Sequence, residues 1–589
     1  MMIVGRRENF VSFLKDDMKP ANVFLVFLHR SLAIGVLAGF SWSTSVLAQG
    51  TGLGIPGIGE AIKETQPPRP QAPQQAPAPV IIQQDEAPLR LQSSETLMVQ
   101  AFRFEGADFI SEEELQERVA SYRGRALNMM DIEEAAGRIT ALYRSRGYPV
   151  ARAYVPRQDA RDGTLTIRVL VGKYGKVSLR NRSLVGDGLL KGALAPLEAD
   201  AAVSRETLER AMLIVGDMPG AEMPRIAISP GERQGSSDLE VEVDAGKRFG
   251  AYAMADNQGS RYTGRNRLRA GVDLNSPLGI GDRLSLSGMA SEGEGLANGR
   301  LAYGFPLAAN GLRGEIAASK TTYELGKEYK DLDATGDAYS IEGTLSYPLI
   351  RSRDRNLYLS LNLAARRMRD EIEATDTSNS RKSKVGTLGA QYESWGNLLG
   401  YSSYSGFSAG LTYGHLELLN ADEEALNKAG ANTGGDYARL NLAFNGSLAL
   451  SEKLSLSVAL SGQKALMGKN LDGTEQMSIS GTNGVKAYRE VVLGDNGYLA
   501  NAELRYALPE LAGLNHALGA FGDTGRIHLQ NADYTTTNGV RLSDVGLGYY
   551  VGYKALMGSI QVARKVGPRP SVVEEDDKTR VLLQVGLVF

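Results

Sequence analysis

From residue 248 to the end, the chain repeats short segments in which apolar and polar residues strictly alternate. In residues 356–364 every second position is leucine, and in residues 453–461 leucine and valine alternate with serine and alanine. Successive side chains of a β-strand point to opposite faces, so each segment predicts a strand with one apolar face. The same pattern occurs in residues 282–291, 404–418, 436–450, 498–508 and 580–589. One apolar and one polar face are typical of a membrane β-barrel, whose outer wall meets lipid and whose lumen is wet.

A soluble β-sandwich also alternates, but two features of the chain disfavour it. The alternation continues for about 340 residues, which is long for one sandwich domain. Polar stretches at residues 370–384 and 420–435 separate the segments, and we expect them to be long loops. Beyond the N-terminal region, no stretch approaches the roughly 20 apolar residues of a spanning helix. A membrane-spanning form of this chain is therefore expected to be a closed barrel, because only helices and closed barrels satisfy every backbone group in lipid.

Residues 1–48 have the features of a secretory signal peptide. An apolar run at residues 32–40 follows basic residues, and a small-residue exit ends at Ala48, after which we expect cleavage. A start at Met18 would give a signal of conventional length. A membrane anchor is the alternative, but His29 and Arg30 interrupt the apolar region, which favours cleavage.

Residues 49–95 are rich first in glycine and then in proline. Residues 66–79 predict an extended spacer of about 40 Å, at about 3 Å per residue. A short helix is expected to end near residues 61–64, and the sequence leaves open whether this segment plugs the barrel. The glycines of residues 52–57 spell G-x-G-x-x-G, but no strand precedes them, so they do not predict a dinucleotide site.

Residues 96–246 predict two α+β units, at 96–173 and 174–246, ahead of a barrel at 247–589. In the first unit, Ser111 and Glu114 predict a capping box that opens a helix to about residue 122. A second helix should run from an Asn128 cap to residue 146, with one apolar stripe. Strands are expected at 99–104, 148–155 and 164–171, which makes the order β-α-α-β-β. The second unit repeats this order, with strands at 177–180, 225–229 and 238–243 and helices at 189–197 and 204–215.

Composition excludes several classes of function. The net charge of −3 over 589 residues gives no signal of nucleic-acid binding. The chain has no cysteine, which excludes disulfides and thiolate metal sites. The four histidines, His29, His415, His516 and His528, are not at metal-ligand spacing. Because the sequence has no nucleophile elbow, spaced triad or P-loop, we expect no catalytic residue, no metal and no cofactor, and the chain is not predicted to be an enzyme.

The α+β units and three motifs resemble one family, the outer-membrane transporters of two-partner (type Vb) secretion. This is the haemolysin secretion/activation type, called TpsB, within the Omp85 superfamily. Residues 147–167 are similar to the end of the family's first POTRA domain. Val485-Lys486-Ala487-Tyr488 resembles the V-R-G-Y/F loop motif, and Phe521-Gly522-Asp523-Thr524-Gly525 resembles the F-x-D-x-G strand motif. The resemblance covers residues 99–589.

The resemblance implies a mainly β protein with two POTRA domains and a barrel of 16 strands. It also implies that the sixth extracellular loop folds into the lumen, where Lys486 would pair with Asp523 on the barrel wall and Tyr488 would pack nearby. Lysine replaces the family's arginine and Ala487 replaces its glycine, so the pair loses the planar fork of a guanidinium. Arg489 is a rival partner for Asp523, and the sequence leaves this choice open. A solvated loop charge is the alternative for Lys486, which the cost of an unpaired buried Asp523 disfavours.

The implied function is secretion of one large exoprotein, an adhesin or cytolysin, across the outer membrane of a Gram-negative bacterium. POTRA domains in the periplasm would hold the unfolded exoprotein by adding its strand to a sheet edge, and no nucleotide would be hydrolysed. Other expected partners are outer-membrane lipid, lipopolysaccharide and the barrel assembly machinery, which would read the terminal Phe589. An assembly factor of the same superfamily and a passive porin are the alternatives. Two POTRA-like units argue against both, because assembly factors more often carry three or five and a porin needs none.

Overall fold

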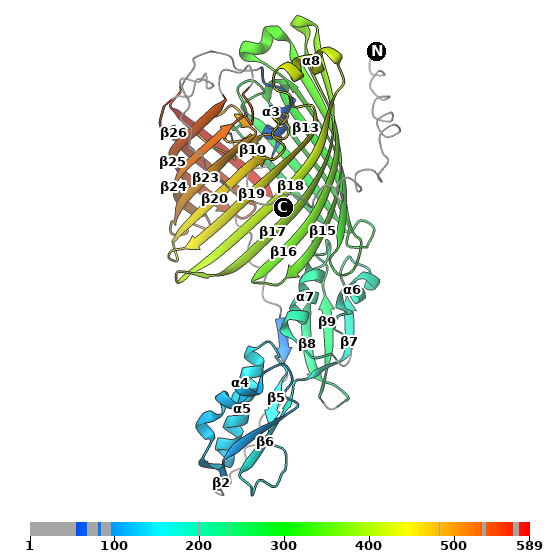
Figure 1. Cartoon of the computed structure of the whole chain (residues 1–589), viewed down its shortest axis with the longest axis vertical. Coiled ribbons are helices and arrows are strands. Elements are labelled where there is room, and N and C mark those ends of the chain that lie inside the picture. The colour runs from blue at the N-terminus through cyan, green and yellow to red at the C-terminus, as the bar shows by residue number, and fades with distance from the viewer. Residues whose placement is uncertain are drawn as a thin grey trace. The chain divides into compact units, whose positions relative to one another are not determined.

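The computed structural model describes residues 55–66, 80–83, 96–197, 201–233, 235–481, 483–532, 538–568 and 577–589 (Figure 1). The predicted signal peptide, residues 1–48, and the spacer residues 67–79 lie outside the described residues. Within the described ranges, no helix is long and apolar enough to cross a membrane. These ranges contain a short helix, two α+β units and a closed β-barrel.

The first α+β unit combines two helices with short strands. Its elements are β2 (Thr96–Val99), β3 (Ala101–Glu105), α4 (Glu112–Arg118), η1 (Ala120–Tyr122), β4 (Arg125–Asn128), α5 (Met129–Ser145), β5 (Arg152–Tyr154) and β6 (Thr164–Leu170). The strands form a sheet in the order β3-β6-β5 and a separate β2–β4 pair. The main elements follow the expected order, but the first strand is divided at Gln100 and β4 precedes the second helix.

The two helix starts of this unit differ in how they are capped. The side chain of Asn128 accepts from the N–H of Asp131, and the Asp131 carboxylate accepts from the N–H of Asn128. At the first helix, Ser111 accepts from the N–H of Glu114, but the Glu114 carboxylate pairs with Arg146. The reciprocal box predicted at Ser111 is therefore wrong, because the guanidinium of Arg146 attracts the glutamate away from the helix start.

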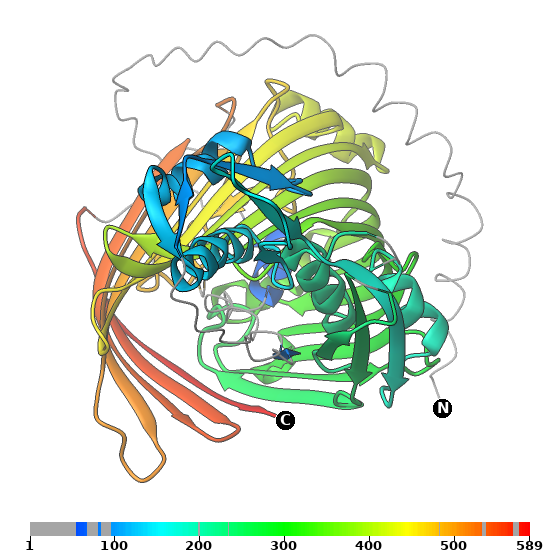
Figure 2. The same cartoon turned by 90° about the horizontal axis from the view of Figure 1, so that it is seen from below.

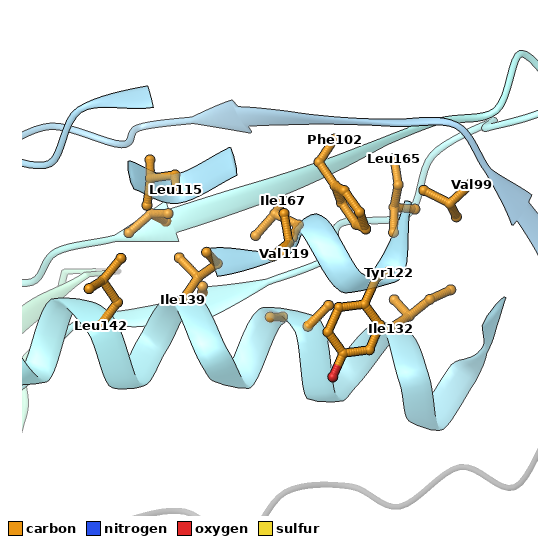
Figure 3. Close-up of a cluster of buried hydrophobic side chains, with 14 of the residues drawn as sticks. Val99, Phe102, Leu115, Val119, Tyr122, Ile132, Ile139, Leu142, Leu165 and Ile167 are labelled. Atoms are coloured by element: carbon orange, nitrogen blue, oxygen red, sulfur yellow. The ribbon is translucent and has the colours of Figure 1, made fainter. Parts of the chain in front are cut away.

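The core of the first unit lies between α5 and the strands. The predicted stripe of α5 is buried, and it comprises Ile132, Ala135, Ala136, Ile139, Leu142 and Tyr143. Figure 3 shows Ile139 and Leu142 pointing toward Leu115 of α4 and Ile167 of β6. Side chains three and four residues apart share one helix face, which explains why this spacing buries a continuous stripe.

The second α+β unit contains a strand that comes from outside it. Its own elements are β7 (Lys173–Asn181), α6 (Asp187–Leu194), α7 (Arg205–Gly216), β8 (Arg225–Pro230) and β9 (Ser236–Val243). The sheet order is β1-β8-β9-β7, and β1 (Val80–Gln83) comes from the segment before the first unit. β1 pairs parallel to β8 from Val80 opposite Arg225 to Gln83 opposite Ile228. The sequence did not predict this added strand.

The barrel closes from 16 strands in chain order, each antiparallel to its neighbours. They are β10 (Phe249–Asp256), β11 (Arg267–Asn275), β12 (Arg283–Ser291), β13 (Leu296–Pro306), β14 (Arg313–Glu324), β15 (Ala334–Arg351), β16 (Arg355–Ile372), β17 (Thr377–Leu398), β18 (Tyr401–Leu418), β19 (Gly435–Ala449), β20 (Leu454–Ala465), β23 (Asn496–Ala507), β24 (Asn515–His528), β25 (Gly539–Tyr553), β26 (Leu556–Lys565) and β27 (Thr579–Val588). The first and last strands pair from Tyr252 opposite Val588 to Asp256 opposite Gln584. The predicted barrel of 16 strands is confirmed.

The polar stretch at residues 370–384 is not a long loop. β16 continues to Ile372, β17 starts at Thr377, and only a 3₁₀ turn, η4 (Glu373–Thr375), lies between them. Pairing continues through this stretch from Ile372 opposite Thr377 to Ala365 opposite Lys384. A strand needs an apolar face only where it meets lipid, so polar residues extend the ladder beyond the membrane. The stretch at 420–435 is a connection as expected, and it contains α8 (Ala421–Ala429).

The outer wall of the barrel is apolar, as the alternation predicts. One row of leucines crosses five strands as successive cross-strand partners: Leu345, Leu361, Leu388, Leu411 and Leu440. Leu345, Leu388 and Leu411 are exposed at the outer surface, whereas Ala364 on the opposite face of β16 is buried. A row of large apolar side chains at the outer surface is suited to contact with lipid.

Candidate functional site

The connection between β20 and β23 is folded inside the barrel. This lumenal loop, residues 466–481 and 483–495, contains two short paired strands, β21 (Met477–Ser478) and β22 (Leu493–Gly494). Ile479, Val485, Ala487 and Tyr488 are at most 3% exposed. They pack in one apolar cluster with side chains of β23 to β27, such as Phe521. The loop is therefore held against the inner wall by burial as well as by polar contacts.

At the tip of the loop, Lys486 contacts Asp523 on β24. The Lys486 Nζ lies 2.7 Å from Asp523 Oδ2, and the Asp523 side chain is fully buried. Asn501 on β23 donates to the other carboxylate oxygen at 2.7 Å. The same Nζ lies 4.3 Å from the centre of the Phe521 ring. Where the sequence left the partner of Asp523 open, the contact is made by Lys486.

The barrel also holds the backbone of the loop tip, through two residues that the sequence did not single out. The N–H of Ala487 donates to Asp544 Oδ2 on β25 at 2.5 Å. Arg580 on β27 donates to the carbonyl oxygens of Lys486 and Tyr488, at 3.0 and 3.2 Å. Asp544 lies directly opposite Asp523 in the register of the two strands. Neither residue belongs to a motif, and only the strand register could have placed Asp544 beside Asp523.

Small residues in and beside the two motifs make room for these contacts. A Cβ on Gly525 would lie 3.0 Å from the Cβ of Ile479, so the glycine lets the loop pack on the wall. A Cβ on Gly546 would lie 2.2 Å from the Phe521 ring, which lies across the neighbouring strand. Ala487, which replaces the family's glycine, is not among the residues with positive φ. Alanine fits there because the backbone does not require a glycine.

A second segment, α3 (Ile58–Thr65), lies in the lumen, and Figure 2 shows it inside the ring of strands. At its start, the N–H of Ile58 donates to Asp370 Oδ1 on β16 at 2.9 Å. At its end, Arg269 donates to the carbonyl oxygens of Thr65 and Glu64 at 2.7 and 2.9 Å, and Arg267 donates to that of Glu64 at 3.1 Å. An anion at the first turn and cations at the last turn complement the helix dipole. The short helix expected near residues 61–64 is present.

The helix and the lumenal loop contact each other. Gly59 approaches Gly473 so closely that a Cβ on Gly59 would lie 2.7 Å from the backbone of Gly473. Lys63 Nζ donates to the carbonyl oxygen of Thr474 at 3.0 Å. Ser260, between β10 and β11, donates its N–H to Glu64 and its hydroxyl to Glu490 of the loop. Displacement of either segment therefore removes contacts of the other.

Buried charges accompany these contacts. Burial raises the pKa of Glu64 to about 7, against the effect of hydrogen bonds from Ser260 and Thr263. Burial also lowers the pKa of Lys63 to about 8. For Glu475 of the loop, burial would raise the pKa, but Arg366 and Arg439 outweigh burial and hold it at about 2. Glu475 is thus an anion in the lumen, while Glu64 titrates near neutral pH.

Docking of α3 should weaken as the pH rises from about 5 to 8. The docked Glu64 has a pKa of about 7 against an ordinary value of 4.5, so the docked state binds its proton more tightly. This contribution is fully present below pH 4.5 and is lost as the pH rises through 7. The lowered pKa of Lys63 acts only above about pH 8. Conductance of the purified protein in lipid bilayers should therefore rise with pH, and Glu64→Gln should flatten the profile. An unchanged profile in Glu64→Gln would assign the pH dependence to another group.

The terminal residue Phe589 follows the last barrel strand. Its side chain is 62% exposed, and its N–H donates to the carbonyl oxygen of Ala251 on β10 at 2.8 Å. The ring thus lies accessible beside the seam between the first and last strands.

Comparisons with known proteins match most of the chain. The family model of haemolysin secretion/activation proteins ShlB/FhaC/HecB matches residues 235–552, and the ShlB-type POTRA domain matches residues 97–172. The heme/hemopexin transporter protein HuxB of Haemophilus influenzae (strain 86-028NP) is 26% identical over 527 residues, which cover 88% of this chain and 92% of that protein. The outer membrane transporter CdiB of Dickeya dadantii (strain 3937) is 23% identical over 448 residues, 74% of this chain and 77% of that protein.

Among solved structures, CdiB from Escherichia coli has the same fold. It superposes with a TM-score of 0.68 at 21% identity and covers 85% of this chain and 93% of that structure. The family model, the POTRA match and this shared fold agree with the barrel and the first α+β unit described above. The chain therefore belongs to the haemolysin secretion/activation protein family of the Omp85 superfamily, and it is an outer-membrane barrel protein with POTRA domains on the periplasmic side.

Proposed function

We propose that this chain is a two-partner secretion transporter that recognises one unfolded exoprotein in the periplasm and passes it through the barrel. The POTRA domains bind the exoprotein, and the lumen conducts it. Folding of the exoprotein outside the cell supplies direction, and no nucleotide is hydrolysed. Membership of the family and the transporter names of its relatives HuxB and CdiB support the secretion of a partner protein.

The observation that carries the recognition step is the pairing of β1 with β8. The edge of β8 pairs in parallel register with four residues of this chain. Its backbone groups can therefore hold an extended strand. Strand addition reads backbone hydrogen bonds and tolerates many side chains, as an unfolded cargo requires. Edge strands with unpaired N–H and C=O groups favour such pairing. A cargo strand that uses β8 has to displace β1.

The lumen also has to open for a polypeptide to pass. The lumenal loop and α3 both occupy it, and hydrogen bonds between them and the wall, such as those of Asp370 and Lys486, hold them there. Polar contacts of this kind can exchange with water or with cargo when the segments move. We therefore assign α3 the role of a plug and the Lys486–Asp523 pair the role of a latch on the loop.

A proline in β1 should increase binding of the exoprotein. Ile82→Pro removes a backbone donor and disfavours the β1–β8 pairing. In the unchanged protein, β1 leaves only a fraction of the β8 edges free, and this fraction lowers the apparent affinity of the full-length transporter for the N-terminal part of the exoprotein. When β1 is released, that affinity should rise by the inverse of the fraction. Binding is measured with purified protein, and Ile82→Thr, which keeps the N–H, is the matched control. Equal affinity in Ile82→Pro and Ile82→Thr would place the cargo site elsewhere.

The function itself is tested by secretion. We expect deletion of this protein to remove the large exoprotein encoded nearby from the culture medium, while other outer-membrane barrels keep their levels. Culture medium, periplasm and outer membrane are compared with and without the protein. Intact secretion with a fall of other barrels would indicate an assembly factor and would overturn the proposal.

A further inference from the structure

One aromatic residue of the first α+β unit is held at the surface in an unfavourable backbone conformation. Phe109, in the turn between β3 and α4, is 62% exposed and has a φ of 75°. Glycine, asparagine and aspartate adopt this conformation readily, whereas a bulky residue rarely does. Among the described residues, Phe109 is the one aromatic residue with positive φ. Strained residues gather at sites of function, so this exposed ring is a candidate for binding.

The turn is anchored on both sides of Phe109. Gly106 lies so close to a carbonyl oxygen of β6 that a Cβ would approach it to 2.7 Å. The buried Tyr143 donates its hydroxyl to the carbonyl oxygen of Asp108 at 2.8 Å. Ile110 is buried in the core of the unit. Because these neighbours are fixed, the strain at Phe109 is not relieved by a shift of the turn.

The ring of Phe109 forms one half of an aromatic pair with Tyr148. The two ring centres lie 4.9 Å apart, and the planes differ by 29°, so the rings are stacked. The ring of the buried Tyr143 lies 6.1 Å from that of Tyr148 and supports the pair from within. A supported and exposed aromatic pair offers a contact for another apolar side chain, and aromatic partners gain most from such stacking.

The aromatic pair lies at the end of the first unit that joins the second. Val150, two residues after Tyr148, packs so closely on Gly172 that a Cβ there would lie 2.5 Å from the valine side chain. Gly172 is one of the two residues between β6 and β7. β7 belongs to the same sheet as β8. The pair is therefore next to the point where the chain enters the sheet with the β8 edge.

The register of this sheet directs a bound strand toward that point. β1 runs parallel to β8 and ends at Gln83, opposite Ile228. Two residues further along β8, Pro230 lies opposite Ser237 of β9, which in turn lies opposite Tyr174, the second residue of β7. An exoprotein strand in the place of β1 would thus leave the sheet at the end where the chain enters from the first unit.

We propose that the Phe109–Tyr148 pair binds an aromatic side chain of the exoprotein, in the segment that follows the strand on β8, and thereby selects one exoprotein. This inference rests on the proposed function, which leaves selection unexplained, because strand addition reads the backbone and tolerates many side chains. A transporter for one exoprotein needs a contact that reads side chains, since specificity is a difference between two affinities. An unfolded exoprotein presents its aromatic side chains before they are buried.

The test measures binding of the N-terminal part of the exoprotein to the full-length transporter. Phe109→Gly removes the ring and relieves the strain, and it should bind about tenfold more weakly, the scale of one good aromatic contact in an interface. Phe109→Tyr keeps the ring and should bind as the unchanged protein does. Met130→Ala is the matched control, because Met130 is a 74% exposed apolar residue at the other end of α5, a helix about 25 Å long.

Hydrogen exchange of the full-length protein separates loss of the contact from loss of the fold. Amides of α5 should be as well protected in Phe109→Gly as in the unchanged protein, because glycine adopts a positive φ without strain. Weaker binding together with lost protection of α5 would assign Phe109 a structural role and would overturn the proposal.

A double-mutant cycle identifies the aromatic partner in the exoprotein. Aromatic residues of the exoprotein are replaced by alanine one at a time. At one position the change should weaken binding to the unchanged transporter about tenfold and have no further effect on Phe109→Gly. That position should lie C-terminal to the exoprotein residues that crosslink to a photoreactive residue at Ser229, which is exposed at the end of β8.

Three further outcomes would overturn the proposal. The first is equal affinity of Phe109→Gly and Met130→Ala for the exoprotein. The second is additivity of Phe109→Gly with every aromatic replacement in the exoprotein. The third is a coupled position N-terminal to the residues that crosslink to Ser229. Failure of the proposed function would look different, because the unchanged transporter would then not bind the exoprotein and secretion would continue without it.

Discussion

A transporter that carries Gly57→Cys together with Asp370→Cys should stop secreting its exoprotein under oxidising conditions and recover when a reductant is added. A Cβ on Gly57 would lie 3.7 Å from the Cγ of Asp370, so two cysteines there can be bridged after a small shift. The natural chain has no cysteine, so no other disulfide competes. The bond would tie α3 to β16 inside the lumen. Secretion should fall to the level of cells that lack the protein.

The single variants separate the lock from the loss of side-chain contacts. Asp370 also accepts from the hydroxyl of Tyr323 at 2.6 Å and pairs with Arg381, and Asp370→Cys alone removes both contacts. That single variant should therefore loosen α3 in the lumen, the opposite of the locked form. Full secretion by the oxidised double variant, with the disulfide verified by mass spectrometry, would show that α3 need not leave its place.

Lys486→Ala should weaken docking of the lumenal loop more than Lys486→Ala and Asp523→Ala together. In the single variant the fully buried carboxylate of Asp523 loses its cation and keeps the hydrogen bond from Asn501. Breaking a buried pair from one side costs about 3 to 5 kcal/mol, because it leaves an uncompensated charge. Asp544 lies opposite Asp523 and adds a second carboxylate to the same place. Removal of both partners avoids this penalty.

Hydrogen exchange of the loop amides measures how firmly the loop is docked in each variant, and secretion shows whether loop docking matters for transport. Amides of the lumenal loop should exchange fastest in Lys486→Ala, more slowly in the double variant and slowest in the unchanged protein. Lys486→Arg is the conservative control, and it should protect the loop at least as well, since a guanidinium can bind the carboxylate with two donors. Equal exchange in all four proteins, or full secretion by the double variant at normal barrel levels, would remove the latch from the mechanism.

The strands were predictable where lipid imposes a pattern, and less so elsewhere. The predicted strand at residues 404–418 agrees with β18 to within three residues, because alternation marks both ends of its lipid-facing part. At residues 370–384 the same reasoning failed, since a strand outside the membrane needs no apolar face. β1 was missed because four residues after a proline-rich segment carry no sign of a partner strand about 145 residues away.

The residues of the lumenal site also fall into those that the sequence predicts and those that only the structure reveals. Lys486 and Asp523 were named from motifs, which are local in sequence, and the structure places them 2.7 Å apart. Asp544 and Arg580 were not found, since a single charged residue in a strand reports only which face it lies on. Their contacts with the loop tip depend on how β25 and β27 are aligned with β24 around the barrel. Likewise, α3 was expected only as a short helix, and its partners Arg267, Arg269 and Asp370 come from two distant strands.

The sequence by itself determined that the chain forms a barrel behind two α+β units, because periodicity is a local property that follows directly from the alternation of side chains along a strand and their repeat along a helix. It also determined the two motifs. Only the tertiary structure decided what fills the lumen and which carboxylates surround Lys486. These features depend on the register between strands and on closure of the barrel, which bring together residues separated by up to several hundred positions. No local pattern encodes such distances, because each contact is set by the packing of the whole wall.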